Sequence, residues 1–194
     1  MKKTSKKEFQ VRRANPDEYQ VLGKMTVNVY EQLPGMPGPA ELPAYYAMLR
    51  DAGSRAKKPT VDILVAVTPD DELLGGVTFV GDMKYYDSGG TASSCSGSSG
   101  VRLLAVKPEA RGYGVGRSLT EACIHRAVDR GSSQVILHTT QAMKIAWGMY
   151  QRMGFRRSPD LDFSQGNLAV FGFRLDVNPI NGGRHGRTGS KAWK

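Results

Sequence analysis

Three glycines stand at alternate positions in the segment EARGYGVGRSLTEA, and an arginine lies on either side of them. Gly112, Gly114 and Gly116 fall between an apolar run and a helix-like pattern, flanked by Arg111 and Arg117. The first amides of a helix have no partner inside the helix, and the helix dipole adds positive charge there. A strand, a glycine loop and a helix start in this order therefore predict an anion site suited to phosphate.

Two common phosphate-binding loops do not match this segment. The dinucleotide motif G-x-G-x-x-G fits Gly112 and Gly114, but Arg117 stands where the third glycine belongs. The ATP loop ends in Gly-Lys-Ser or Gly-Lys-Thr, and neither tripeptide occurs in the chain. The sequence therefore supports neither a nicotinamide enzyme nor a P-loop ATPase.

Other reactive side chains have simpler interpretations. Asp70, Asp71 and Glu72 form the turn between two β-rich runs, which is typical of a solvated hairpin tip. Cys123 lies on the apolar face of a helix pattern and is expected in the core, while Cys95 is expected as an exposed free thiol. Two cysteines give neither a disulfide framework nor a metal-ligand spacing, so no metal site is expected.

Hydrophobic spacing predicts the elements that must position the glycine loop. The chain alternates between strand-like and helix-like patterns, which predicts a single mixed α/β domain. Strands are expected at 9–14, 60–68, 73–83, 101–106, 133–140 and 168–177, and helices at 16–33, 41–54, 116–131 and 141–155. Residues 85–100, rich in glycine and serine, are expected to form a flexible loop.

The net charge of +9 is concentrated at the two ends of the chain. Residues 1–13 carry a net charge of +5, residues 174–194 carry +4, and the remainder is neutral. This predicts a domain over residues 9–177 with a basic arm (1–8) and a basic flexible tail (178–194), and argues against a nucleic-acid domain. The chain lacks an apolar run of about 18 residues and a secretory signal, so a cytoplasmic protein without a membrane span is expected.

Two segments resemble the GNAT N-acetyltransferase superfamily. ARGYGVG, after the apolar LLAVKPEA, is similar to that family's acetyl-CoA loop, Arg/Gln-x-x-Gly-x-Gly/Ala. AWGMYQRMGF, residues 146–155, is similar to the family's Ala-x-x-x-Tyr-x-x-x-Gly-Phe segment. The resemblance, from Phe9 to about Val177, implies a GNAT fold: a mostly antiparallel sheet of six to seven strands, splayed in the middle and flanked by about four helices.

The resemblance also implies an enzyme that moves an acetyl group from acetyl-CoA, its co-substrate, to a primary amine. The backbone of Leu104, Ala105 and Val106 would hold the pantetheine arm, and one of their amides would polarise the thioester carbonyl. Tyr150 would act as the general acid for the leaving sulfur. The residues implied at the pyrophosphate are Arg111, Gly112, Tyr113, Gly114, Val115, Gly116 and Arg117.

Several assignments stay open. Periodicity alone makes Tyr150 a core residue of its helix, and only the resemblance favours catalysis. Glu31, His138 or water are candidates for the base. Met143 stands where many family members have an asparagine that helps to bind CoA, so Lys144 or Trp147 would replace that contact.

The acceptor is the least readable part of the sequence. Tyr45, Tyr46, Tyr85 and Tyr86 are candidates to line its pocket, and a small amine, amino acid, antibiotic or protein amine all remain open. The oligomeric state, including a homodimer, is open as well. Two other functions compete with the enzyme: an acyl-CoA-binding sensor of the same fold, and a nucleic-acid-binding protein acting through its basic termini.

Overall fold

Strand β2 (Val61–Val67) shows why the chain builds a sheet with two covered faces. Ile63 and Val65 belong to the core on one face, and Leu64 and Ala66 belong to the core on the other. Because side chains alternate along a strand, burial on both sides requires apolar residues at successive positions, as in VDILVAV.

The computed structural model describes residues 8–177. Apart from Glu8, the expected N-terminal arm (1–8) lies outside the described residues, as does the expected tail (178–194).

Eight strands form the sheet, in the order β1–β2–β3–β4–β5–β8–β6, and β7 pairs with β8. Every neighbouring pair is antiparallel except β4 and β5, which are parallel. The expected mostly antiparallel sheet is confirmed, with eight strands instead of six to seven because two very short strands, β6 and β7, pair with β8. The remaining bounds are β1 Gln10–Arg13, β3 Leu73–Val80, β4 Ser98–Val106, β5 Gln134–Thr139, β6 Arg156–Arg157, β7 Phe163–Gln165 and β8 Leu168–Asp176.

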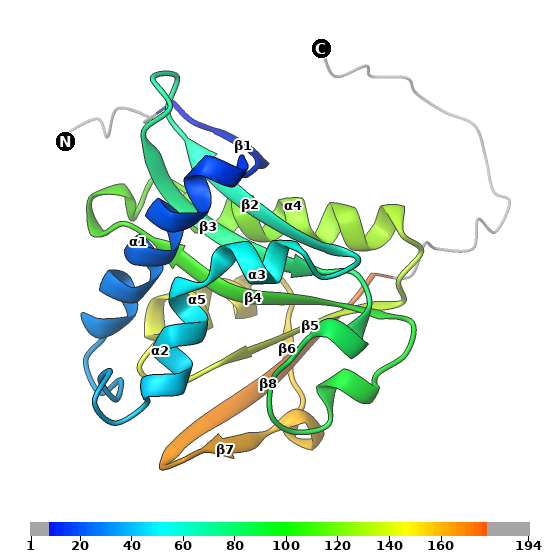
Figure 1. Cartoon of the computed structure of the whole chain (residues 1–194). Coiled ribbons are helices and arrows are strands. Elements are labelled where there is room, and N and C mark those ends of the chain that lie inside the picture. The colour runs from blue at the N-terminus through cyan, green and yellow to red at the C-terminus, as the bar shows by residue number, and fades with distance from the viewer. Residues whose placement is uncertain (1–7, 178–194) are drawn as a thin grey trace, which may run out of the picture.

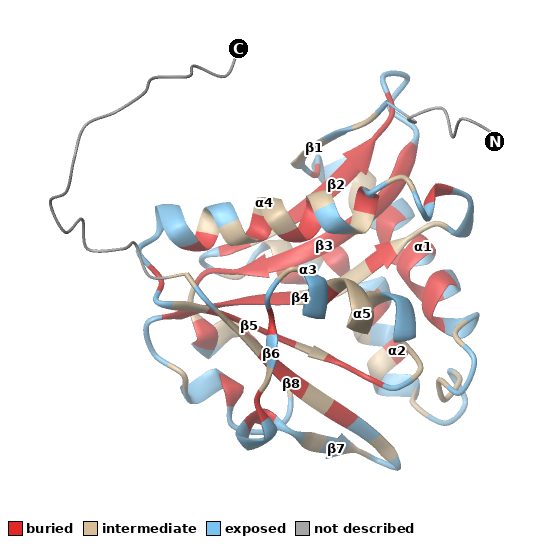
Figure 2. Cartoon of the chain, turned by 180° about the vertical axis from the view of Figure 1, so that it is seen from behind, coloured by how far each residue is buried: buried red, intermediate tan, exposed pale blue. Residues whose placement is uncertain are grey.

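Helices cover the sheet on both faces. Helices α1 (Tyr19–Glu31), α2 (Pro43–Arg50) and α3 (Ala52–Ala56) lie over one face (Figure 1), where their apolar side chains form one core cluster. Helices α4 (Val115–Asp129) and α5 (Lys144–Arg152) lie over the other face (Figure 2) and belong to the second cluster. None of the helices in the described part of the chain is long and apolar enough to cross a membrane.

The expected helix over residues 41–54 is two helices. Asp51 lies between α2 and α3 with φ −91° and ψ 70°, which is outside the helical region. Its carboxylate accepts a hydrogen bond from the Ser54 amide at 2.9 Å and so caps α3. Because the Asp51 side chain bonds a nearby amide, it ends one helix and starts another. The described residues therefore form five α-helices in place of the expected four or so.

The segment 85–100, expected to form a flexible loop, connects β3 to β4 but is shorter than expected and contains short helical turns. Two short 3-10 turns, Met83–Tyr85 and Ala92–Ser94, organise it, and β4 begins at Ser98. Tyr86 and Ala92 are fully buried and anchor the segment to the core of the α1 face. Two anchors among many glycines and serines carry no periodicity, so sequence spacing does not reveal them.

A bulge and a divergence interrupt the middle of the sheet. Opposite β3, the pairing jumps from Ala105 to Arg102, and Leu103 within the jump has a left-handed φ of 55°. The parallel pairing of β4 with β5 ends at Val101 and Leu137. Beyond that point the two strands separate, as expected, and leave the second half of β4 without a strand partner on the β5 side among the described residues.

Candidate functional site

A cavity of about 570 Å³ opens where β4 and β5 separate and extends to the start of α4. Its walls come from the second half of β4, the glycine loop, the first turn of α4 and helix α5. We call it the cationic cavity. Of the residues singled out in the sequence, it is lined by Leu104, Val106, Arg111, Gly112, Gly114, Val115, Gly116, Arg117, His138, Met143, Lys144 and Tyr150.

The glycine loop adopts a backbone that other residues resist. Gly112 has φ 82° and Gly114, the residue that precedes α4, has φ 88°. A Cβ at either position would meet nothing within 4 Å, so space is not the constraint there. The left-handed φ is the constraint, because L-residues reach it only at a cost of roughly 1–2 kcal/mol. Gly116 has no such requirement; an added Cβ there would lie 3.5 Å from Val106 Cγ2, against the cavity wall.

The start of α4 presents free amides. The first hydrogen bond of the helix runs from the Ser118 amide to the Gly114 carbonyl at 2.9 Å. The amides of Val115, Gly116 and Arg117 therefore have no partner inside the helix, and all three residues line the cationic cavity. Together with the helix dipole, they favour an anion at this end of the cavity.

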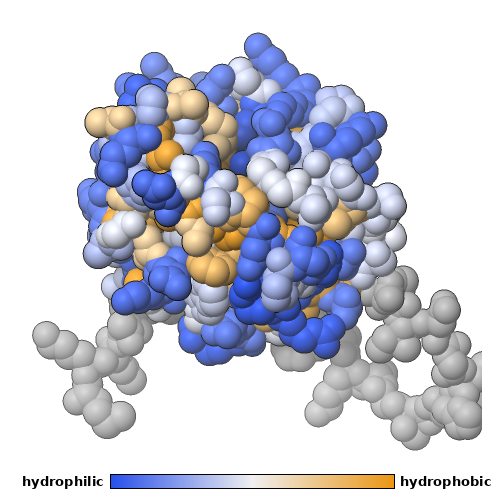
Figure 3. Space-filling view, turned by 90° about the horizontal axis from the view of Figure 1, so that it is seen from below, coloured by the Kyte–Doolittle hydropathy of each residue, from blue (hydrophilic) through white to orange (hydrophobic). Residues whose placement is uncertain are grey.

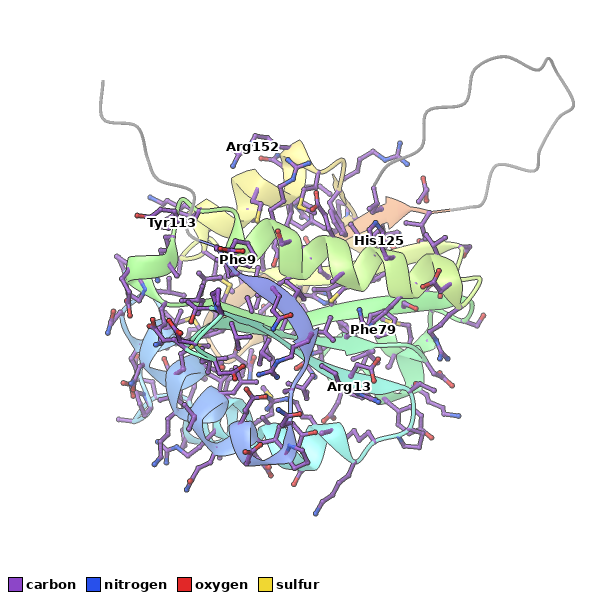
Figure 4. The ribbon with its side chains drawn as sticks, turned by 90° about the horizontal axis from the view of Figure 1, so that it is seen from above. Phe9, Arg13, Phe79, Tyr113, His125 and Arg152 are labelled. Carbon is purple, nitrogen blue, oxygen red and sulfur yellow. The ribbon has the colours of Figure 1, made fainter. Side chains whose placement is uncertain are left out.

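Basic side chains surround the cationic cavity. Arg102, Arg111, Arg117, Lys144 and Arg152 line it, and among the described residues no aspartate or glutamate does. Arg117 is paired with Glu121 at 2.7 Å, and no ion pair within the described chain involves the other four. Figure 4 shows Tyr113 where α4 begins and Arg152 on α5. Sequence analysis missed Arg152, since nothing in the sequence shows that α5 faces the glycine loop.

The second half of β4 turns part of its main chain toward the gap. Successive residues of a strand direct their peptide groups to opposite sides. The Lys107 amide donates to β3 at 2.9 Å, so Val106 and Leu104 direct theirs to the side of the cationic cavity. The Tyr30 hydroxyl donates to the Leu104 carbonyl at 3.4 Å. Ala105, the third residue singled out here, pairs with β3, is buried and does not line the cavity.

Tyr150 lies at the inner wall of the cationic cavity. Its ring is buried and packs edge-on against Phe155, with ring centroids 5.7 Å apart. No hydrogen bond within the described part of the chain involves its hydroxyl group. Burial is the main cause that raises the pKa of Tyr150 above its ordinary value, so the phenol stays protonated at neutral pH.

A second cavity, of about 410 Å³, adjoins the first. Tyr30, Tyr45 and Tyr86 line it, so we call it the tyrosine cavity; residues from the β7–β8 hairpin form another wall. The hairpin and α2 lie at the lower end of the molecule in Figure 1, and seen from below hydrophobic side chains gather near the middle of that face (Figure 3). Both cavities share the residues Tyr30, Val101, Arg102, Leu103, His138 and Met143. The two cavities thus meet where β4 bulges away from β5.

His138 is at this junction, but both of its ring nitrogens are engaged. Nε2 lies 2.9 Å from the Leu161 carbonyl, which can only accept, so Nε2 carries the proton. Nδ1 lies 3.0 Å from the Tyr86 hydroxyl, which then donates to it. Burial lowers the pKa of His138. Glu31 is exposed and lines neither cavity, and His125 is exposed on α4 (Figure 4).

The remaining predicted residues have mixed outcomes. Cys123 is buried, as expected. Tyr45 and Tyr86 line the tyrosine cavity, whereas Tyr46 and Tyr85 line neither cavity. Tyr113 lines neither cavity.

Two residues of helix α5 bear on its role in the site. Trp147, which the sequence leaves as either a CoA contact or a packing residue, lines neither cavity and packs edge-on against Phe173 at 4.9 Å between ring centroids. The helical spacing of Ile145 with Met149 predicts a buried residue, but Ile145 is 72% exposed at the wall of the cationic cavity. The cavity lies where periodicity places the helix core, which is why spacing alone misassigned Ile145.

Comparison with known proteins finds a family model that matches most of the chain. Residues 27–155 match the family model of the acetyltransferase (GNAT) family. Mycothiol acetyltransferase of Arthrobacter sp. (strain FB24) is 40% identical over 57 residues, which make up 29% of this chain and 18% of that protein. N-acetyltransferase 8B of Homo sapiens is 36% identical over 55 residues, 28% of this chain and 24% of that protein. The chain therefore matches less than a quarter of the length of either relative.

Solved structures share the fold at low sequence identity. An acetyltransferase of the GNAT family from Staphylococcus aureus Mu50 aligns with a TM-score of 0.66 at 12% identity, covering 88% of this chain and 100% of that chain. PaiA N-acetyltransferase from Thermoplasma acidophilum, in complex with coenzyme A, aligns with a TM-score of 0.64 at 12% identity, covering 85% and 98%. These likenesses concern the fold of the domain.

Proposed function

The chain belongs to the acetyltransferase (GNAT) family, and we propose that it transfers an acetyl group from acetyl-CoA to a primary amine. The observation that carries the proposal is the cationic cavity. It joins free helix amides, five basic side chains and an unpaired strand edge, with no carboxylate from the described residues in its lining. Such a site suits a ligand that has a polyphosphate at one end and an amide-containing arm at the other.

The proposed orientation of acetyl-CoA follows from the two ends of the cavity. The pyrophosphate lies at the amides of Val115, Gly116 and Arg117, with Gly112 and Gly114 shaping the loop. The pantetheine arm runs along β4 and bonds the main chain of Leu104 and Val106 as an added strand would. This orientation brings the thioester toward the junction of the two cavities, where the acceptor amine enters from the tyrosine cavity.

The chemistry at the junction is direct transfer. The neutral amine nitrogen bonds to the thioester carbonyl carbon, the carbon–sulfur bond breaks, and CoA leaves as a thiolate. An amide of β4 that faces the gap stabilises the negative charge on the carbonyl oxygen. Tyr150, whose phenol is protonated at neutral pH, then donates its proton to the thiolate and is reprotonated from solvent.

The proton of the acceptor amine goes to water in this proposal. His138 already donates from Nε2 and accepts at Nδ1, so neither nitrogen is free for the amine. The neutral amine is the nucleophile, and its proton passes to solvent as the amide bond forms.

Replacing Tyr150 tests this proposal. Tyr150→Phe is expected to lower kcat by about 10²-fold or more, the usual contribution of a general acid, while calorimetric CoA binding is unchanged. Tyr85→Phe is the matched control, because Tyr85 lines neither cavity. Transfer is measured as release of free CoA thiol with a panel of amine acceptors.

Two other outcomes would contradict parts of this proposal. An unchanged kcat in Tyr150→Phe would reject Tyr150 as the acid. If the wild-type protein bound CoA but acetylated none of the amines, the protein would be an acyl-CoA sensor of the same fold.

A further inference from the structure

Arg102 is the basic residue that both cavities share. Its Nη1 donates to the Tyr86 carbonyl, and its guanidinium lies 5.2 Å from the centroid of the Tyr86 ring. A guanidinium has five N–H donors, and none of the others makes a hydrogen bond within the described part of the chain. Arg102 also forms no ion pair there, unlike Arg12, Arg157 and Arg174, each of which has a carboxylate partner.

A second buried cation, Arg55, lies near Arg102, and Asp51 is the carboxylate that favours its charged form. Arg55 is 8% exposed, and its Nε is buried without a hydrogen-bond partner. Burial first, and the charge of Arg102 second, lower the pKa of Arg55 to about 10. Asp87, the carboxylate in the lining of the tyrosine cavity, is largely exposed and bonded to Lys58 at 2.8 Å. This corner of the protein therefore carries positive charge that a bound anion would balance.

The rest of the tyrosine cavity is apolar or aromatic. Its walls include Tyr45, Met48, Phe163, Leu168 and Val170. A volume of about 410 Å³ is within the range of small-molecule sites. The bound molecule thus needs an anionic group near the junction and an apolar body that extends away from it.

We propose that the acceptor is a free α-amino acid with an apolar or aromatic side chain, and that Arg102 binds its carboxylate. This inference rests on the proposed acetyl transfer. The amine must reach the thioester at the junction, where Arg102 is next to Leu103 of the bulge. An amine and a carboxylate that both lie there are separated by very few atoms, as in an α-amino acid. The N-terminus of a protein chain has an amide in place of that carboxylate.

The test compares acids with their carboxamides, which keep the same side chain and amine. L-Phenylalanine, L-leucine and L-methionine, each beside its carboxamide, are titrated by calorimetry into protein saturated with CoA. Acetylation of the same six compounds is measured in parallel. At least one acid is expected to bind about tenfold or more tightly than its amide, since a bidentate arginine–carboxylate pair is among the stronger polar contacts.

Variants separate recognition from general damage. Arg102→Gln is expected to remove the preference for the acid, and Arg102→Lys to keep part of it. Arg50→Gln, an exposed arginine outside both cavities, is the control and keeps the preference. If Arg102→Gln fails to fold, Arg102→Lys decides, because lysine keeps the charge but not the bidentate geometry.

The possible failures are distinguishable. Carboxamides that bind as well as the acids, or no binding by any of the acids, would overturn this inference. Acetylation of carboxamides in that case would leave the proposed acetyl transfer standing. Acids that bind through Arg102 but are never acetylated would support the anion site and reject the transfer.

Discussion

The cationic cavity and the tyrosine cavity meet at one bulge, yet they are assembled differently. The end of the cationic cavity that we propose for the phosphates comes from one contiguous stretch, the glycine loop and the first turn of α4. The tyrosine cavity draws on α1, α2, the 85–100 segment, β4, β5 and the β7–β8 hairpin. A cradle of main-chain amides needs only a local motif, whereas a pocket for a particular side chain needs groups that only the fold brings together.

The two cavities differ in charge as well. Five basic residues and no described carboxylate line the cationic cavity, whereas Arg102 and Asp87 are the charged residues in the lining of the tyrosine cavity. Excess charge suits a ligand with several phosphates, and one arginine that forms no ion pair with the described residues suits one carboxylate. Substitutions that affect one cavity and spare the other test this division.

The largest effect is expected from Gly114→Val. A β-branched side chain resists the left-handed φ of 88°, so the loop before α4 must move and the free amides lose their alignment. CoA affinity should fall by about 100-fold or more, because several charge-assisted bonds depend on this alignment. Calorimetry with CoA measures it.

Gly131→Ala is the matched control for Gly114→Val. Gly131 also has a left-handed φ, 72°, but lies at the C-terminal end of α4 and lines neither cavity. It should lower thermal stability and leave CoA affinity intact. Equal losses of affinity in the two variants would show that the loop acts through stability alone.

An intermediate effect is expected from Arg152→Glu. The change places a carboxylate in the cationic cavity, so the KM for acetyl-CoA should rise by about tenfold. The rise should be smaller at high salt, because residue 152 is exposed and salt screens its repulsion of the phosphates. The KM for the acceptor should stay the same, since Arg152 does not line the tyrosine cavity. A matching rise in the acceptor KM would contradict the separation of the two cavities.

The smallest effect is expected from Ile145→Ser. Because Ile145 is 72% exposed, its loss should change the free energy of unfolding by less than about 0.5 kcal/mol. Loss of its contact with a bound ligand should weaken CoA binding by a few-fold. Denaturant unfolding and calorimetry check the two expectations separately. A marked loss of stability would show that Ile145 packs in the core after all.

Local signals account for the parts of the fold and site that the sequence predicts well. The β-rich apolar run VDILVAV predicts a strand, and Gly131 ends the predicted helix 116–131, where its positive φ is found. These features depend on neighbours in the sequence. The break at Asp51 was not predicted, because a side-chain hydrogen bond competes there with the helix. The burial of Tyr86 was not predicted either, because it depends on a core built from distant parts of the sequence.

The sequence by itself determined the glycine loop, the helix that follows it and the positions of the main strands along the chain, because backbone conformation and periodicity are local properties. Only the tertiary structure decided that Arg152 lines the same cavity as the glycine loop and that Arg102 forms no ion pair with another described residue. It also engaged both nitrogens of His138, which removes that residue as a direct base. Charge balance and hydrogen bonding depend on which groups lie close together in the fold. At the junction of the two cavities, the bulge at Leu103 decides which groups of β4 face the gap.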